Sequence, residues 1–362
     1  MLARELRTIG LKIGTSVAGG VEFSGNVADL QRANLWSRVA NRIVVRVDEF
    51  HASTFHELER RAKKVEWGRY ISPGTNVRFR VTCRKSRLYH SDAVAQRLGA
   101  AVERAGGKFA STTDDDEDES TVHDAQLFIV RIADDICTIS ADSSGELLHR
   151  RGYRQAIGKA PLRETLAAAM LFGSEWDKSA PLVDPMCGSG TIAIEGAMIA
   201  RNIAPGTGRK FAFEKWPDHD PRTWNAMMDA AREAVIERAT APIIASDRDA
   251  GAVASTIANA ERARVASDIE VSERAISAIE LPPGPGWIVT NPPYGLRVGE
   301  TGPLRNLYSQ LGRILRERGK GYLLVLLSAD KALDAQMKIR LREILRTNNG
   351  GIPVRLVAGF GE

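Results

Sequence analysis

From about residue 151 onward, short apolar runs alternate with stretches of helical periodicity. Such alternation is typical of a parallel sheet, because each connection must cross back over the sheet before the next strand. The pattern predicts strands near 181–183, 243–246, 269–271, 287–290 and 322–327. Two last apolar runs, 344–347 and 353–358, flank Asn348-Asn349-Gly350-Gly351 and predict a β-hairpin. The back half is therefore predicted to be an α/β domain.

The front half mixes short strands with helices. Helices are predicted over 26–39, 55–65 and 91–105, and strands over 42–47, 76–82, 127–132 and 136–141. In the strand over 76–82, Arg78 and Arg80 should share one face, opposite Phe79. The acidic run 111–120 is interpreted as a loop, because it lacks the glycine turn and spaced ligands of a calcium loop.

Charge is distributed unevenly between the two halves. Residues 1–110 hold 20 lysines and arginines against 10 acidic residues, a net charge of +10, while the remainder has a net charge of −5. A basic front half is typical of a polyanion-binding domain, although a solvated face of an ordinary domain would give the same count. The candidates for phosphate contact are Arg78, Arg80, Arg84, Lys85 and Arg87.

The composition of the chain excludes several classes of protein. No run approaches the roughly 18 apolar residues of a membrane span, and the first residues lack the apolar segment of a secretory leader. Three widely spaced cysteines match neither a disulfide framework nor a metal site, and the six histidines show no ligand spacing. We therefore expect a cytoplasmic protein without a bound metal or a membrane partner.

The first chemical motif is an apolar strand that runs into Asp184-Pro185-Met186-Cys187-Gly188-Ser189-Gly190 and then a helix from Thr191. Such a glycine turn exposes backbone N–H groups and lets a ligand approach closely. It is not a dinucleotide fingerprint, because alanine stands where the third glycine would fall. An acid before the turn repels phosphate and favours a ligand that carries an amino group.

The second motif, Ser246-Asp247-Arg248-Asp249, follows the next predicted strand. A carboxylate at this position can accept hydrogen bonds from both hydroxyls of a ribose. Either acid can instead cap the helix that begins near Ala250. The two roles are compatible if Asp247 faces the ligand and Asp249 is the cap.

The third motif, Asn291-Pro292-Pro293-Tyr294, follows the fourth predicted strand. Consecutive prolines fix the backbone and remove amide donors, so the Asn291 carboxamide oxygen and the Pro292 carbonyl can both accept from one planar amine. Tyr294 offers a flat face for a stacked base. A rigid turn with a core tyrosine would explain this motif alone, but not its place beside the other two.

Together these motifs resemble the class I S-adenosylmethionine-dependent methyltransferases of the Asn-Pro-Pro-Tyr type, which methylate planar amino nitrogens. More narrowly, nearly all of the chain resembles the THUMP-domain RNA methyltransferases that make N2-methylguanosine in ribosomal or transfer RNA. Besides the glycine turn, the strings that carry this resemblance are 19–21, 32–38, 151–154, 160–164 and 204–206.

The resemblance implies a Rossmann-like seven-stranded methyltransferase domain preceded by an α+β ferredoxin-like and THUMP RNA-binding region. The implied division is a ferredoxin-like domain over 1–70, a THUMP domain over 71–150, a linker over 151–165 and the methyltransferase domain over 166–362. It also implies S-adenosyl-L-methionine as the cofactor and ribosomal or transfer RNA as the partner.

Roles carried over by the resemblance give Asp184, Gly188 and Gly190 to the methionine part of the cofactor and Asp247 to its ribose. The expected catalytic residues are Asn291, Pro292, Pro293 and Tyr294. The expected cofactor-binding residues are Asp184, Pro185, Cys187, Gly188, Gly190, Thr191, Asp247, Arg248, Glu273, Ala275 and Asn291. Ala275 stands where the family has an acid for the adenine amine, so a backbone group or Glu273 would take that contact and Ile276 would pack on the ring.

The expected reaction is direct in-line transfer of a methyl group to the N2 amine of guanine, without a covalent enzyme intermediate. Cys187 is interpreted as a packing residue, because no histidine lies near it in the sequence. Trp36 and Tyr89 are expected in the core rather than as base-stacking groups. The alternatives are an adenine-N6 methyltransferase on RNA or DNA, a protein glutamine methyltransferase and a non-catalytic RNA-binding module.

Overall fold

The computed structural model describes residues 1–17, 19–112, 125–155, 162–294 and 301–361. The chain divides into two compact units. The C-terminal unit comprises Met1–Glu5, His149–Gly208 and Asp229–Glu362, and the N-terminal unit comprises Leu6–Leu148 and Arg209–Met228. Most of the predicted acidic loop over 111–120 lies outside the described residues.

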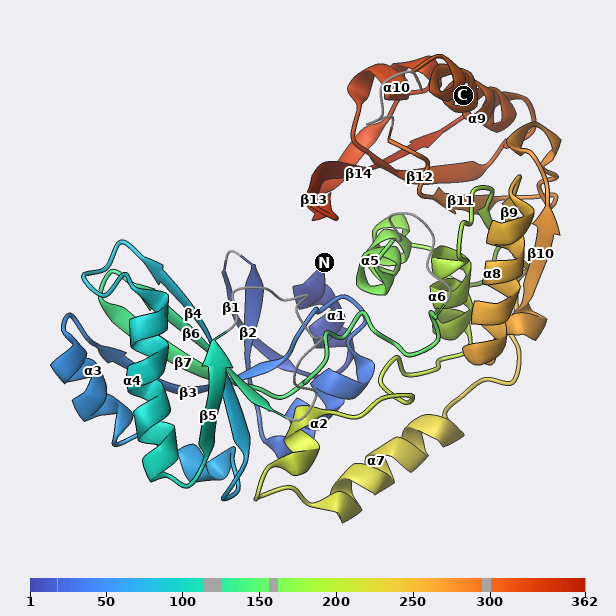
Figure 1. Cartoon of the computed structure of the whole chain (residues 1–362). Helices are drawn as coiled ribbons and strands as arrows, with labels where there is room; N and C mark the ends of the chain where they lie inside the picture. Colours follow the sequence, from blue (N-terminus) through green and yellow to red (C-terminus); the bar gives the residue numbers. More distant parts are fainter. Residues whose placement is uncertain (18, 113–124, 156–161, 295–300, 362) are drawn as a thin grey trace. The chain divides into compact units, whose positions relative to one another are not determined.

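Seven described strands of the C-terminal unit form one sheet in the order β10-β9-β8-β11-β12-β14-β13 (Figure 1). Their bounds are β8 (Leu182–Asp184), β9 (Ile243–Asp247), β10 (Ile269–Glu273), β11 (Gly286–Thr290), β12 (Tyr322–Ser328), β13 (Arg342–Asn349) and β14 (Ile352–Phe360). The first five are parallel, and β14 runs antiparallel to both β12 and β13. Each strand predicted in this half is confirmed, as is the C-terminal hairpin.

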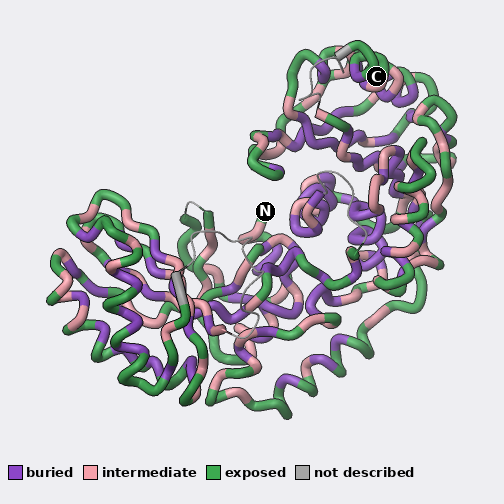
Figure 2. Tube along the Cα trace, viewed as in Figure 1, coloured by how far each residue is buried: buried purple, intermediate pink, exposed green. Residues whose placement is uncertain are grey.

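Helices cover both faces of this sheet. They are α5 (Glu164–Ser174), α6 (Thr191–Ala200) and α8 (Ala250–Arg262) on one face, and α9 (Thr301–Glu317) and α10 (Lys331–Gln336) on the other. Neighbouring strand residues alternate between the two cores: Leu182 packs with α6, whereas Val183 packs with α9. Helix α6 is buried along nearly its whole length (Figure 2), in agreement with a sequence that is apolar except for Thr191 and Glu195.

The N-terminal unit contains a five-stranded sheet in the order β3-β7-β6-β4-β5 among its described residues. The strands are β3 (Val44–His51), β4 (Asn76–Arg84), β5 (Lys108–Thr112), β6 (Gln126–Ala133) and β7 (Ile136–Asp142). The unit also holds the hairpin β1 (Lys12–Val17) with β2 (Gly20–Ser24), and the helices α2 (Val27–Trp36), α3 (Phe55–Ala62) and α4 (Ser91–Arg104). Helices α1 (Leu2–Thr8) and α7 (Pro221–Glu233) contribute residues to both units.

The sheet of the C-terminal unit brings the three chemical motifs to one edge. Strand β8 lies between β9 and β11 and is parallel to both, so the carboxyl ends of these strands meet. Each of the three motifs begins at one of these ends. The predicted adjacency of the three strand ends is therefore confirmed.

Candidate active site

The glycine turn between β8 and α6 requires glycine at its end for two reasons. Gly190 has a φ of +82°, and a Cβ atom built there would lie 2.7 Å from Cγ2 of Thr256. Gly188 also has a positive φ, +55°, but nothing lies within 4 Å of its Cβ position. Space therefore remains over Gly188 for a ligand to approach the backbone, whereas Gly190 is pressed against α8.

Two buried side chains of α8 hold this turn from behind. Thr256 Oγ1 donates to the carbonyl oxygen of Gly188 at 3.0 Å, and Asn259 Nδ2 donates to that of Ser189 at 3.0 Å. Arg262 Nη1 in turn donates to Asn259 Oδ1 at 2.6 Å. The sequence reasoning missed these residues, and only their spacing of three on one helix face hints at a shared role.

Asp247, at the end of β9, reaches across to the same turn. Its Oδ2 accepts from the backbone N–H of Gly188 at 3.0 Å, and its Oδ1 accepts from the N–H of Asp249 at 3.1 Å. Asp249 caps α8 by accepting from the N–H groups of Gly251 and Ala252. The predicted capping role of Asp249 is confirmed, and each oxygen of Asp247 keeps a second lone pair.

Asp184 links the glycine turn to the third motif. It is 1% exposed, and its Oδ1 accepts from Thr290 Oγ1 at 2.8 Å and from the N–H of Met186 at 3.3 Å. Thr290 is the residue immediately before Asn291. Burial raises the pKa of the Asp184 carboxyl to about 7 despite these hydrogen bonds. Within the described chain, Asp184 Oδ2 accepts no hydrogen bond and carries the capacity to bind a cation.

The Asn-Pro-Pro-Tyr segment is fixed by hydrogen bonds to its side chains. Tyr294 Oη donates to Asn291 Oδ1 at 2.5 Å and accepts from Asn349 Nδ2 at 3.0 Å. Tyr308 Oη donates to the carbonyl oxygen of Pro293 at 3.4 Å. The sequence predicted a free ring face for Tyr294 but not that its hydroxyl would bind Asn291. One lone pair of Asn291 Oδ1 is thus used, and the second remains for another donor.

The residues expected around an adenine lie at the ends of β9 and β10. Glu273 pairs in register with Asp247. Arg248 and Ala275 are exposed. Ile276 packs against the core on the face of the sheet that α9 covers. A cleft of about 280 Å³ opens on that face of the sheet; its lining includes Ser246, Ser272, Arg274, Glu280 and Leu281. The cleft does not include Asp184, Gly188 or Asn291.

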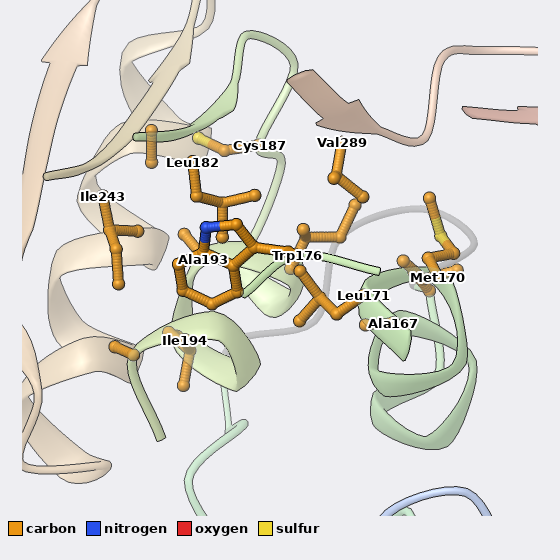
Figure 3. Packing of buried hydrophobic residues seen from close by; sticks show 14 of the residues in the cluster. Ala167, Met170, Leu171, Trp176, Leu182, Cys187, Ala193, Ile194, Ile243 and Val289 are labelled. Atoms are coloured by element: carbon orange, nitrogen blue, oxygen red, sulfur yellow. The ribbon is translucent and has the colours of Figure 1, made fainter. Parts of the chain in front are cut away.

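Cys187 belongs to the buried core cluster next to the turn, together with Leu182, Ala193 and Val289 (Figure 3). It is 6% exposed, and burial raises its pKa to about 12. Both facts agree with the predicted packing role, because burial favours the protonated thiol. No group of three potential metal ligands occurs among the described residues.

The predicted phosphate-binding residues fall into two sets in the N-terminal unit. Arg78 and Arg80 are half-buried on one face of β4, and Phe79 between them is fully buried, as the alternation predicted. Arg84, Lys85 and Arg87 are exposed at the end of β4 and in the following loop.

The two aromatic residues predicted to be core differ in outcome. Trp36 is half-buried at the end of α2. Tyr89 is 69% exposed, so its prediction as a core residue is wrong: its ring packs on His90 instead of under the sheet. Tyr89 lies in the loop after β4, beyond the last residue of the strand. No described helix has the length and apolarity that a membrane crossing demands.

Comparison with known families divides the chain in a consistent way. Residues 151–357 match the family described as the RMKL-like methyltransferase domain. Residues 1–44 match the RlmL ferredoxin-like domain, and residues 52–142 match the THUMP domain.

Individual relatives agree with this division. A protein of Synechocystis sp., provisionally named an RNA methyltransferase, is 33% identical over 98% of this chain and 92% of its own length. The ribosomal RNA large subunit methyltransferase K/L of Methylococcus capsulatus is 35% identical over 98% of this chain, which spans 49% of that relative. The chain thus has about half the length of the K/L relatives it matches.

Solved structures show the same fold. A crystal structure of a protein provisionally described as a methyltransferase, in complex with S-adenosylhomocysteine, has a TM-score of 0.85 and 28% identity, and the match covers 99% of this chain and 94% of the other. The α/β architecture predicted from the sequence, with ferredoxin-like and THUMP domains ahead of it, is confirmed. The chain therefore belongs to the RMKL-like methyltransferases, class I enzymes that use S-adenosylmethionine.

Proposed function

We propose that this enzyme methylates the exocyclic N2 amine of a guanine in ribosomal or transfer RNA, in the cytoplasm. Methylation of RNA is the activity in the names of its relatives, and the base and atom are the finer part of the proposal. The observation that carries it is Asn291 Oδ1, held by the Tyr294 hydroxyl beside a glycine turn backed by two carboxylates; with it we pair the Pro292 carbonyl, the next acceptor along the chain. A planar amine is the group that such a pair of acceptors selects.

The described side chains fit the proposed cofactor. Asp184 Oδ2 is suited to the ammonium of the methionine part, and the open space over Gly188 admits its chain. The remaining lone pairs of Asp247 suit the two ribose hydroxyls. Ala275 offers no side-chain acceptor for the adenine amine, so we assign that contact to the backbone of this segment or to Glu273. Pro185, Cys187, Gly190, Thr191 and Arg248 complete the proposed cofactor site.

When bound, S-adenosylmethionine supplies a methyl group already activated by its sulfonium. The residues then act by position. Asn291 Oδ1 and the Pro292 carbonyl hold the amine by its two hydrogens and turn its lone pair toward the methyl carbon. The methyl carbon–nitrogen bond forms as the carbon–sulfur bond breaks, and the amine loses one proton to water afterwards. No nucleophilic side chain is needed, in agreement with the buried thiol of Cys187.

The direct test is incubation of the full chain with ribosomal and transfer RNA and isotope-labelled S-adenosylmethionine, followed by nucleoside mass spectrometry. Label in N2-methylguanosine supports the proposal. Label in N6-methyladenosine would overturn the choice of base. No label in RNA, together with no binding of S-adenosylhomocysteine in calorimetry, would favour the non-catalytic RNA-binding module.

The proposed contact of Asp184 with an ammonium group predicts a pH dependence of cofactor affinity. Because the pKa of Asp184 is raised, the unliganded fold holds a proton on this carboxyl below about pH 7. The unfolded chain releases that proton near pH 4, so the contribution of Asp184 to the free energy of unfolding falls as pH rises from about 4 to 7. Binding of the cation requires the ionised form. Affinity for S-adenosylhomocysteine should therefore rise about tenfold between about pH 6 and pH 8.

Calorimetry at both pH values, in two buffers of different ionisation enthalpy, measures this affinity and the proton released on binding. Asp184→Asn keeps the acceptor for Thr290 but cannot ionise, so its affinity should be low and independent of pH. An unchanged pH profile in that variant would remove Asp184 from the ammonium site.

The exposed basic loop predicts a salt-dependent effect on RNA binding. Changing Arg84, Lys85 and Arg87 to glutamate should weaken RNA binding at least tenfold at low salt and reduce the slope of log affinity against log salt by roughly two. Filter binding at several salt concentrations measures both. Reversal of Arg318 and Lys320, exposed before the amino end of β12, is the matched control. A slope equal to that of the control would exclude the loop from the RNA interface.

A further inference from the structure

The hairpin between β13 and β14 brings a distant residue to the Asn-Pro-Pro-Tyr segment. Strand β14 runs antiparallel to β12, with Arg355 opposite Ser328, so β14 begins at the edge where the parallel strands end. Asn349 and Ile352 close the hairpin around Gly350 and Gly351, whose φ values are +56° and +81°. Two positive φ values are the signature of a type I′ turn, which ties two strands tightly. The backbone of Asn349 is therefore held rigidly at this edge.

The side chain of Asn349 takes part in a directed chain of hydrogen bonds. Its Nδ2 donates to Tyr294 Oη at 3.0 Å, and Tyr294 Oη donates onward to Asn291 Oδ1 at 2.5 Å. Because an amide nitrogen can only donate, the phenol must use its one proton on Asn291. Asn349 is 8% exposed, so water competes little for these groups.

We propose that Asn349 is a positioning residue for methyl transfer: through the Tyr294 hydroxyl it fixes the Asn291 carboxamide with one lone pair of Oδ1 directed at the target amine. This inference rests on the proposed function, because it assigns Asn291 to the amine. A donor at position 349 sets the direction of the chain. An acceptor there would draw the phenol proton away and release the Asn291 carboxamide to rotate.

Burial keeps the phenol in its protonated form. It raises the pKa of Tyr294 to about 12, and the hydrogen bond from Asn349 lowers that pKa only in part. The hydroxyl therefore carries its proton throughout the neutral range. The chain from Asn349 to Asn291 consequently keeps one direction at any pH at which the enzyme would be assayed.

The test compares single-turnover and steady-state kinetics of the full chain for Asn349→Asp, Asn349→Ala and the exposed neighbour variant Asn348→Ala. Asn349→Asp preserves shape but removes the donor, so it should lower kcat 10- to 100-fold, as should Asn349→Ala. The affinity for S-adenosylhomocysteine, the KM for RNA and the melting temperature should stay close to those of Asn348→Ala. A purely structural role would instead spare Asn349→Asp or shift the melting temperature with kcat.

A double-mutant cycle with Tyr294→Phe identifies the route. In the Tyr294→Phe background, Asn349→Asp should have no further effect on kcat, because the hydroxyl that transmits it is gone. Two results would overturn the inference. One is an equal loss of kcat in both backgrounds, and the other is a kcat of both Asn349 variants within twofold of that of Asn348→Ala. If the wild-type enzyme methylates adenine, the guanine assignment fails, yet this comparison still decides the role of Asn349, since both bases present an exocyclic amine.

Discussion

Asn291→Ala is expected to reduce kcat for methyl transfer by roughly 10²- to 10³-fold or more, because the target amine loses the acceptor that holds it in line. The variant also removes the acceptor of the Tyr294 hydroxyl, which adds to the loss of order around the amine. Asn291 makes no hydrogen bond to the glycine turn among the described contacts, and its neighbour Thr290 keeps its bond to Asp184. Cofactor affinity should therefore change little.

Single-turnover transfer from labelled S-adenosylmethionine and calorimetry with S-adenosylhomocysteine measure the two effects separately. Asn291→Asp is the matched control, since a carboxylate of the same shape still accepts from an amine and should retain more activity than alanine. A large loss of cofactor affinity with a normal rate at saturation would show that Asn291 serves the cofactor and not the target base.

Gly190→Ala is expected to lower the free energy of unfolding of the C-terminal unit by about 2–5 kcal/mol. The left-handed backbone contributes about 1–2 kcal/mol of strain for any residue with a Cβ atom. The contact with Thr256 Cγ2 adds overpacking of about 1–3 kcal/mol, since Thr256 is fully buried and held by its bond to Gly188.

Urea unfolding without cofactor measures this loss, and two variants separate its causes. Gly188→Ala meets no neighbouring atom, so it should show the backbone strain alone. Thr256→Ser removes the methyl group but keeps the hydroxyl, and should recover about 1 kcal/mol or more in the Gly190→Ala background. A loss for Gly190→Ala no larger than for Gly188→Ala would show that α8 yields to the added methyl group.

The sequence predicts this fold well where apolar runs end in distinctive polar residues. The strands that carry Asp184, Asp247 and Asn291 are such cases, and an Asn-Gly-Gly turn marks the last hairpin. The roles of these residues toward a cofactor or a base remain proposals. The predicted domain boundaries at residues 70, 150 and 165 also remain predictions, because the two compact units do not test them.

What the sequence could not reveal depends on how elements rotate and pack. Asn259 contacts Ser189 from 70 positions away, and Asn349 contacts Tyr294 from 55 positions away. Neither residue differs in type from ordinary surface asparagines. The prediction that Tyr89 is buried was wrong because β4 ends before this residue, so its ring lies in a loop and is exposed. Long-range side-chain partners of this kind follow from the packed structure alone.

The hydrogen bond from Thr290 to Asp184 has a thermodynamic consequence. One carboxylate serves both the turn proposed for the cofactor and the residue that precedes the target loop, so the two ligands share an anchor. If one ligand changes the affinity for the other, the second must change the affinity for the first by the same factor. S-adenosylhomocysteine keeps the ammonium group proposed to contact Asp184, so the same reciprocity would hold between spent cofactor and product RNA as they leave.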